Sequence, residues 1–254
     1  MNFKLFTIFH KYIIDDMYKK IDLNKITFIK CNPKFTAQHD LNIKYDIIKE
    51  SEIGKFYNPK LQTDETPYHA PSAIYTIYKN KKYNYPFIGF VEYDIEMTCD
   101  VLDKLTVISN KNKRIIVPFS YRWSIQDLYN QQNFLAANKN AIEQIIIDYN
   151  NFNHTNYKIA DLLKLNPIIC TQQSFFCDKE SFERLMKFIS HIIETGKAER
   201  KGSRPRPSTL MERYIGIGLL LDSLTENVPI IPITCKHLGL HEWKYNQSKI
   251  NFNC

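Results

Sequence analysis

The chain has 254 residues, of which 44% are hydrophobic and 24% charged, and this composition excludes a disordered or fibrous protein. The formal net charge of +7 is compatible with nucleic acid, an anionic membrane surface or a phosphorylated small molecule, but the basic residues are spread along the chain without a nucleic-acid-binding motif. Abundant Ile, Lys and Asn with only seven Gly is typical of an AT-rich genome, so we do not take the net charge as evidence for an anionic partner. No run approaches the ~20 apolar residues of a membrane span.

The cysteines and the amino terminus indicate a cytoplasmic protein. The six cysteines include no Cys-x-x-Cys pair, which argues against a structural zinc site and against a dense disulfide framework, so we expect reduced thiols. The apolar stretch at residues 1–10 lacks the long apolar segment and the small-residue cleavage site of a signal peptide. We interpret it as the first strand.

The chain opens with a predicted βαβ unit, in which strands at residues 4–9 and 25–30 flank a short helix at residues 13–19. Neither a Gly-x-Gly-x-x-Gly sequence nor a Walker motif follows the first strand. If the protein binds phosphate, it must therefore hold it in another way.

The central prediction is a buried strand that ends in three carboxylates. An irregular insertion at residues 31–68 is followed by a helix over residues 71–80 that begins with proline, and then by the apolar run from Phe87 to Val91. Glu92, Asp94 and Glu96 come directly after this run. Ligands of open α/β sheets bind beyond the carboxyl ends of strands, so these acids are candidates to hold a divalent cation and, through it, phosphate. The alternative is a strand that leads into a solvated acidic loop.

The second half continues the alternation of strands and helices. The apolar stretch 105–108 precedes a turn and a strand at 114–119, and a later strand at 168–176 is interrupted by polar residues. The apolar stripe from Phe182 to Ile193, with Asp178 as cap and Gly196 as stop, gives the clearest helix. The remaining expectations are helices at 124–129, 141–149, 157–165 and 209–224, a flexible basic loop at 197–208, a last strand at 228–234 and a tail at 235–254. Together they predict a single domain over residues 1–254 with an α/β fold, in which helices flank a mostly parallel, Rossmann-like sheet.

The order of these features resembles the GT-A glycosyltransferases, and among them a family of polysaccharide-biosynthesis-cluster proteins. The first strand ends in His-Lys, Thr66-Pro67-Tyr68-His69 leads into the helix at 73–80, and Phe87-Ile88-Gly89-Phe90 forms the next strand. The segments 175–182 and 211–216 resemble later parts of the same family. The resemblance spans most of residues 3–225 and implies a GT-A fold.

The resemblance also implies a reaction. It is the transfer of a sugar from a nucleotide-sugar donor of the UDP or GDP class to a hydroxyl of a glycan, polysaccharide or glycoprotein acceptor, with Mn²⁺ or Mg²⁺ bound by an Asp-x-Asp-like element. That element falls on Glu92-Tyr93-Asp94 or, in the alternative register, on Asp94-Ile95-Glu96. Glu replaces one Asp of the family pattern, so which carboxylate contacts the metal and which contacts ribose stays open. A cation of this kind neutralises the leaving nucleoside diphosphate as a Lewis acid.

Further residues receive roles from the resemblance. Glu212 is the candidate general base, although Thr209-x-x-Glu212 also fits a capping box in which the glutamate only stabilises the helix start. The others are grouped by role: His10 and Lys11 near the nucleotide, Asp64 and Glu65 at sugar hydroxyls, Arg204 and Arg206 at phosphate or an anionic acceptor, and His237 and His241 as late metal ligands. For the histidines and arginines, an ordinary surface or core role is the alternative.

Two other function classes compete with this hypothesis. A nucleotidyltransferase that makes nucleotide sugars would share the sheet and the metal chemistry, but it would carry a Gly-rich loop after the first strand, which this sequence lacks. A basic nucleic-acid-binding protein would show clustered Lys and Arg with exposed stacking aromatics and strongly salt-dependent binding. We expect no nucleic-acid partner.

Overall fold

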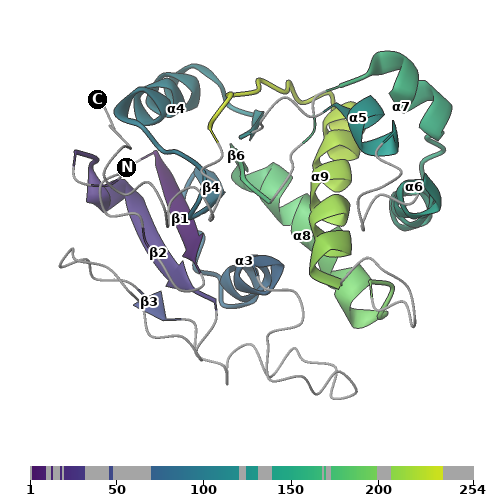
Figure 1. Ribbon diagram of the computed structural model, residues 1–254, viewed down its shortest axis with the longest axis horizontal. Helices are drawn as coiled ribbons and strands as arrows, with labels where there is room; N and C mark the ends of the chain where they lie inside the picture. The colour runs from purple at the N-terminus through teal and green to yellow at the C-terminus, as the bar shows by residue number, and fades with distance from the viewer. Residues whose placement is uncertain are drawn as a thin grey trace.

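A six-stranded sheet forms the centre of the computed structural model, with the strand order β3-β2-β1-β4-β6-β5 (Figure 1). In chain order the strands are β1 (Phe3–Phe9), β2 (Ile26–Lys30), β3 (Asp46–Ile47), β4 (Phe87–Glu92), β5 (Ile116–Pro118) and β6 (Phe175–Asp178). The first four strands are parallel, whereas β6 pairs antiparallel with both β4 and β5. The structure describes residues 2–9, 13, 18, 20–31, 46–47, 70–119, 124–130, 139–167, 169, 173–198 and 207–236.

The sheet lies between two layers of helices. The described helices are η1 (Leu23–Lys25), α3 (Ala70–Lys79), α4 (Cys99–Lys111), α5 (Ile125–Asn130), α6 (Lys139–Asn153), α7 (Ile159–Leu165), α8 (Lys179–Glu194) and α9 (Pro207–Glu226). Ile88 and Phe90 of β4 belong to a core shared with α3, α6, α8 and α9, while Phe87 and Val91 face a second core shared with α4. Because parallel strands covered on both faces carry continuous apolar runs, the pattern predicted this burial. The expected α/β fold with a mostly parallel sheet is confirmed.

Helix α8 follows its sequence signals closely. The Asp178 carboxylate accepts a hydrogen bond from the Ser181 backbone N–H at 2.9 Å, which caps the helix as expected. Beyond the last turn, Gly196 has a φ of 67°, a left-handed conformation that glycine adopts without a steric penalty. The predicted bounds of this helix are therefore correct to within two residues at each end.

Three expectations from the sequence are wrong in part. Residues 105–108, assigned to no helix from the sequence, lie within α4, which Thr98 caps by accepting from the Val101 N–H at 3.3 Å. The expected last strand at 228–234 makes only isolated bridges to the β5 region, since Pro229 and Pro232 have no N–H to donate to a ladder. Among the cysteines, Cys99 is disulfide-bonded, so reduced thiols are not found throughout.

The close approach of β1 to β4 gives the first testable prediction. A methyl group added at Gly89 would collide with Leu5 Cδ2 and lie 3.2 Å from Phe176 Cδ2. We expect Gly89→Ala to lower the free energy of unfolding by about 1–3 kcal/mol, measured as a lower urea midpoint. Gly218→Ala in α9 is the control, because its methyl group would meet no atom nearer than Leu185 Cδ1 at 3.1 Å, whereas the one at Gly89 also lies 3.3 Å from the Phe175 backbone carbonyl, and alanine favours a helix. An unchanged midpoint for Gly89→Ala would contradict this packing.

Candidate active site

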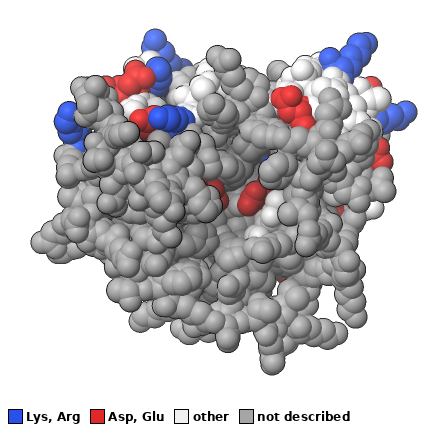
Figure 2. Space-filling view, in the orientation of Figure 1, with Lys and Arg blue, Asp and Glu red and all other residues white. Residues whose placement is uncertain are grey.

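The candidate site lies where the order of the strands reverses. The chain proceeds outward from β1 through β2 to β3 and then returns to β4 on the other side of β1. The connections that leave the carboxyl ends of the neighbouring strands β1 and β4 lead to opposite sides of the sheet, and such a point is the usual ligand-binding crevice of an open α/β sheet. In Figure 2, acidic side chains are visible inside a hollow near the centre of the displayed face.

The end of β4 brings two of the predicted carboxylates into this region. The chain turns after Glu92, because the Ile95 N–H donates to the Glu92 carbonyl at 3.0 Å, and the Tyr93 N–H donates to the Ile8 carbonyl of β1 at 3.0 Å. Asp94 lies in the turn and is only 8% exposed. A buried carboxylate is thereby held beside the end of β1.

Glu212 of α9 joins these two residues, although it is more than 100 positions away in the sequence. Burial raises the pKa of Glu92 well above its usual range, and the negative charges of Glu212 and Asp94 raise it further. Three carboxylates thus lie close enough to repel one another. Because like charges disfavour joint ionisation, the cluster favours a bound proton or a cation.

The structure overturns the alternative assignment of Glu212 to a capping box. Helix α9 begins at Pro207, so Thr209 is already inside the helix and cannot be its cap. Glu212 instead accepts a hydrogen bond from the Gln173 side chain. Burial raises the pKa of Glu212 to about 7, with a contribution from Asp94, while Arg213 and the Gln173 hydrogen bond act in the opposite direction. A carboxyl group with this pKa can accept and release a proton near neutral pH.

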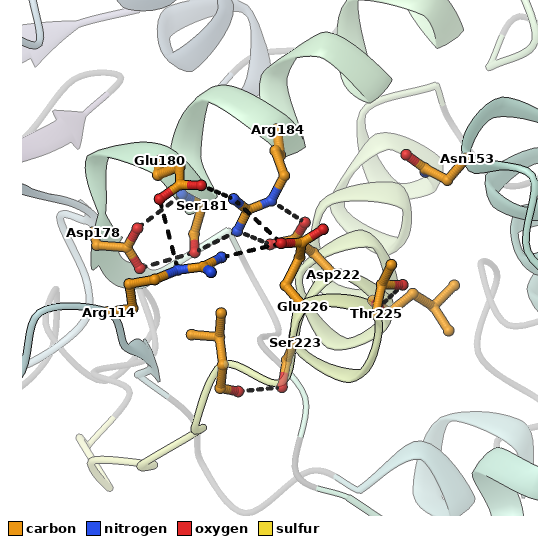
Figure 3. Close-up of polar contacts among 12 residues, drawn as sticks. Arg114, Asn153, Asp178, Glu180, Ser181, Arg184, Asp222, Ser223, Thr225 and Glu226 are labelled. Carbon is orange, nitrogen blue, oxygen red and sulfur yellow. Dashed lines mark hydrogen bonds and ion pairs between the residues drawn. The ribbon is translucent and has the colours of Figure 1, made fainter.

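A network of ion pairs fixes α9 against α8 and β5 (Figure 3). Arg184 of α8 makes two hydrogen bonds to Asp222 of α9, at 2.7 and 3.0 Å, and a third to Glu180 at 3.0 Å. Arg114, which precedes β5, lies 3.5 Å from Glu226 at the end of α9. The bidentate pair between Arg184 and Asp222 is half-buried, and it therefore holds the orientation of α9, the helix that carries Glu212.

The raised pKa of Glu212 predicts how stability depends on pH. The folded state binds a proton that the unfolded chain loses near pH 4.5, so stability decreases as the pH rises from about 4.5 to 7. We expect Glu212→Gln to raise the free energy of unfolding by about 2 kcal/mol at pH 8 and to have little effect at pH 4.5. Urea unfolding at both pH values tests this, with Glu143→Gln in α6 as the control. An equal effect at both pH values would contradict it.

Two residues of the site were not predicted from the sequence. Gln173 is 2% exposed and contacts Glu212, and the neighbouring Ser174 accepts a hydrogen bond from the Glu92 backbone N–H at 3.1 Å. They form a link between the end of β4 and the start of α9. The only signal in the sequence was a polar interruption between two apolar stretches.

The other predicted site residues fall into two groups. Glu96 donates its backbone N–H to the Lys236 carbonyl at 2.8 Å, and after burial its charge is the next cause of the raised pKa of Cys235, so it lies beside the segment after α9. Tyr93 is buried in the core that α4 covers. The remaining predicted residues lie outside the described part of the chain: His10, Lys11, Asp64, Glu65, Arg204, Arg206, His237 and His241.

The residues present allow a cation only with help from other ligands. Within the described ranges, no three His, Cys, Asp or Glu side chains are arranged to hold a metal ion by themselves. Mg²⁺ sites that bind phosphates commonly use one or two carboxylates, with the phosphate oxygens and waters completing the shell. Asp94 with Glu92 fits this kind of site.

Comparison with solved structures identifies a protein of similar architecture. The chain superimposes on the apo structure of the bifunctional glycosyltransferase WbbM with a TM-score of 0.54 and 11% sequence identity over 93% of its length. The fold is shared with a glycosyltransferase. The chain covers 45% of that protein, so it spans less than half of its length. No family model and no curated protein matches the sequence.

None of the described helices has the length and apolarity required to cross a membrane. The longest, α9, has 20 residues and carries Glu212, Arg213 and Asp222. Its apolar side chains pack into the core with α6 and α8.

Proposed function

We propose that this protein is a metal-dependent glycosyltransferase that moves a sugar from a UDP- or GDP-sugar donor to a hydroxyl group of a glycan, polysaccharide or glycoprotein. The observation that carries the proposal is the convergence of Glu92, Asp94 and Glu212 at the strand-order reversal. The fold shared with a glycosyltransferase supports it.

In this proposal the end of β4 would hold Mn²⁺ or Mg²⁺. Asp94 and Glu92 would be the ligands from the protein, and the bound cation would supply positive charge to the donor diphosphate. Asp94 is the better candidate for direct contact, because it lies in the turn beyond the strand. Glu92 is held at the strand end, where the Ser174 hydroxyl accepts a hydrogen bond from the Glu92 backbone N–H.

Glu212 is the proposed general base. Its carboxylate takes the proton of the acceptor hydroxyl as that oxygen forms a bond to the anomeric carbon of the donor. The bond between this carbon and the phosphate oxygen breaks, and the nucleoside diphosphate leaves with the electron pair. The pKa of about 7 suits this role, because the group is partly ionised at neutral pH and becomes a stronger base than an ordinary glutamate.

Residues outside the described ranges complete the proposal. His10 and Lys11 follow β1 directly in the sequence and would contact the nucleotide, and His237 or His241 would add a metal ligand. Asp64 and Glu65 would bind sugar hydroxyls. Arg204 and Arg206 precede α9 and would contact phosphate or an anionic acceptor.

An assay of product release tests the function. Incubation with a panel of UDP- and GDP-sugars, methyl glycosides as acceptors and Mn²⁺ should release nucleoside diphosphate, and omission of the metal should prevent this. A nucleotidyltransferase would instead release pyrophosphate from a nucleoside triphosphate and a sugar phosphate. Absence of nucleoside diphosphate release with every donor from the folded protein would contradict the proposal.

A further inference from the structure

Gln173 has a backbone conformation that is unusual for a buried residue. Its φ is 57°, in the left-handed region that side chains other than glycine rarely adopt. Lys81, His154, Asn166 and Asn227 are the other described non-glycine residues with positive φ, and all four are exposed. Gln173 is only 2% exposed. Strained conformations inside a protein cluster at functional sites, where the surrounding structure enforces them.

Hydrogen bonds hold Gln173 between the end of β4, which carries Glu92, and helix α9, which carries Glu212. The next residue, Ser174, accepts from the Glu92 N–H with its hydroxyl at 3.1 Å and from the Phe119 N–H with its carbonyl at 3.0 Å. On its other side, the Gln173 amide donates a hydrogen bond to Glu212. The side chain is thus fixed at the position where β4 and α9 approach each other.

Among the described residues, only the NH₂ half of the Gln173 amide has a hydrogen-bond partner. The NH₂ group donates to Glu212, whereas Oε1 is buried and makes no hydrogen bond within the described part of the chain. Buried amide oxygens nearly always accept a hydrogen bond, since the loss of water must be compensated. The amide that donates to the candidate base Glu212 therefore also carries an oxygen, Oε1, that can accept a further hydrogen bond.

We propose that Gln173 binds the sugar acceptor, with Oε1 accepting a hydrogen bond from the hydroxyl next to the one that Glu212 deprotonates. This inference rests on the proposed function. Two neighbouring acceptor groups match two neighbouring hydroxyls, so the acceptor is a saccharide with vicinal hydroxyl groups. An isolated hydroxyl, such as that of a serine side chain, would leave Oε1 without a partner.

Calorimetric titration tests the assignment. The protein is first saturated with Mn²⁺ and with UDP or GDP, and then titrated with methyl hexopyranosides and, separately, with N-acetylserinamide. We expect at least one methyl hexopyranoside to bind, and Gln173→Met to weaken its binding about tenfold or more while the affinity for the nucleotide stays the same. Gln173→Asn is a second variant, because asparagine tolerates the left-handed conformation but is one methylene shorter. Gln144→Met in α6 is the control for loss of an amide elsewhere.

The outcomes separate this inference from the proposed function. Hexopyranoside binding that is unchanged in both Gln173 variants would overturn the inference and leave the function standing. Binding of the nucleotide without any hexopyranoside, or a preference for N-acetylserinamide, would do the same. If neither nucleotide nor saccharide binds to the folded wild-type protein, the proposed function fails, and the inference fails with it.

Discussion

Glu212→Gln is expected to lower kcat for sugar transfer by about 10²–10⁴-fold, because the amide cannot accept the proton of the acceptor hydroxyl. Donor binding should change little, since the proposed contacts with the diphosphate come from Asp94 and Glu92. Steady-state rates of nucleoside diphosphate release, measured over a range of donor concentrations, give both values. In the wild type kcat should rise with pH through about 7, as Glu212 loses its proton.

The control for Glu212 must remove a carboxylate without disturbing the cluster. Glu143 lies on α6, which does not contribute to the site, so the Glu143→Gln variant should keep the wild-type kcat. A Glu212→Gln variant with wild-type turnover would show that another group accepts the proton. The effect on stability at pH 8 would then be the only consequence of its raised pKa.

Asp94→Asn is expected to reduce turnover about 100-fold or more and to remove the response to Mn²⁺. The substitution keeps the size of the side chain but replaces a charged ligand with a neutral one, so a cation is held weakly. Rates of nucleoside diphosphate release over a Mn²⁺ titration provide the measurement. The half-saturating concentration of the metal should rise beyond the range of the titration.

Two neighbouring carboxylates serve as comparisons for Asp94. Glu92→Gln should also weaken the response to Mn²⁺, because Glu92 interacts with Asp94 and Glu212. Glu96→Gln should leave it unchanged, since Glu96 lies beside Cys235. If Glu96→Gln abolished the response and Glu92→Gln did not, the metal-binding register would be Asp94-Ile95-Glu96.

Local signals explain which elements could be predicted from the sequence. The apolar run of β4, the Asp178 cap and Gly196 each specify structure through neighbours in the chain. Helix α4 was missed because its apolar stretch at 105–108 contains Thr106 and Val107, whose branched side chains also suit a strand. The segment 228–234 is apolar enough for a strand, but its prolines interrupt the ladder.

The candidate site was predictable only in part, because some of its contacts join segments that are far apart in the chain. Glu92 and Asp94 follow a recognisable strand, so their place at the edge of the sheet could be inferred. The contact between Gln173 and Glu212 depends on how α9 packs near the turn before β6, and no periodic pattern encodes this. The sequence therefore gives no indication of a role for Gln173, which follows from its burial and its positive φ.

Thermal unfolding with nucleotides tests whether the acidic cluster binds a nucleotide-sugar donor together with a divalent cation. The melting temperature of the wild type is measured with UDP, GDP and their sugar conjugates, each with and without Mn²⁺. A ligand present at about 100 times its Kd stabilises the folded state by about 2.7 kcal/mol, which is a shift of several degrees. We expect such a shift for one nucleotide class, only when Mn²⁺ is present and only when Asp94 is intact. Equal melting temperatures with and without every nucleotide would contradict it.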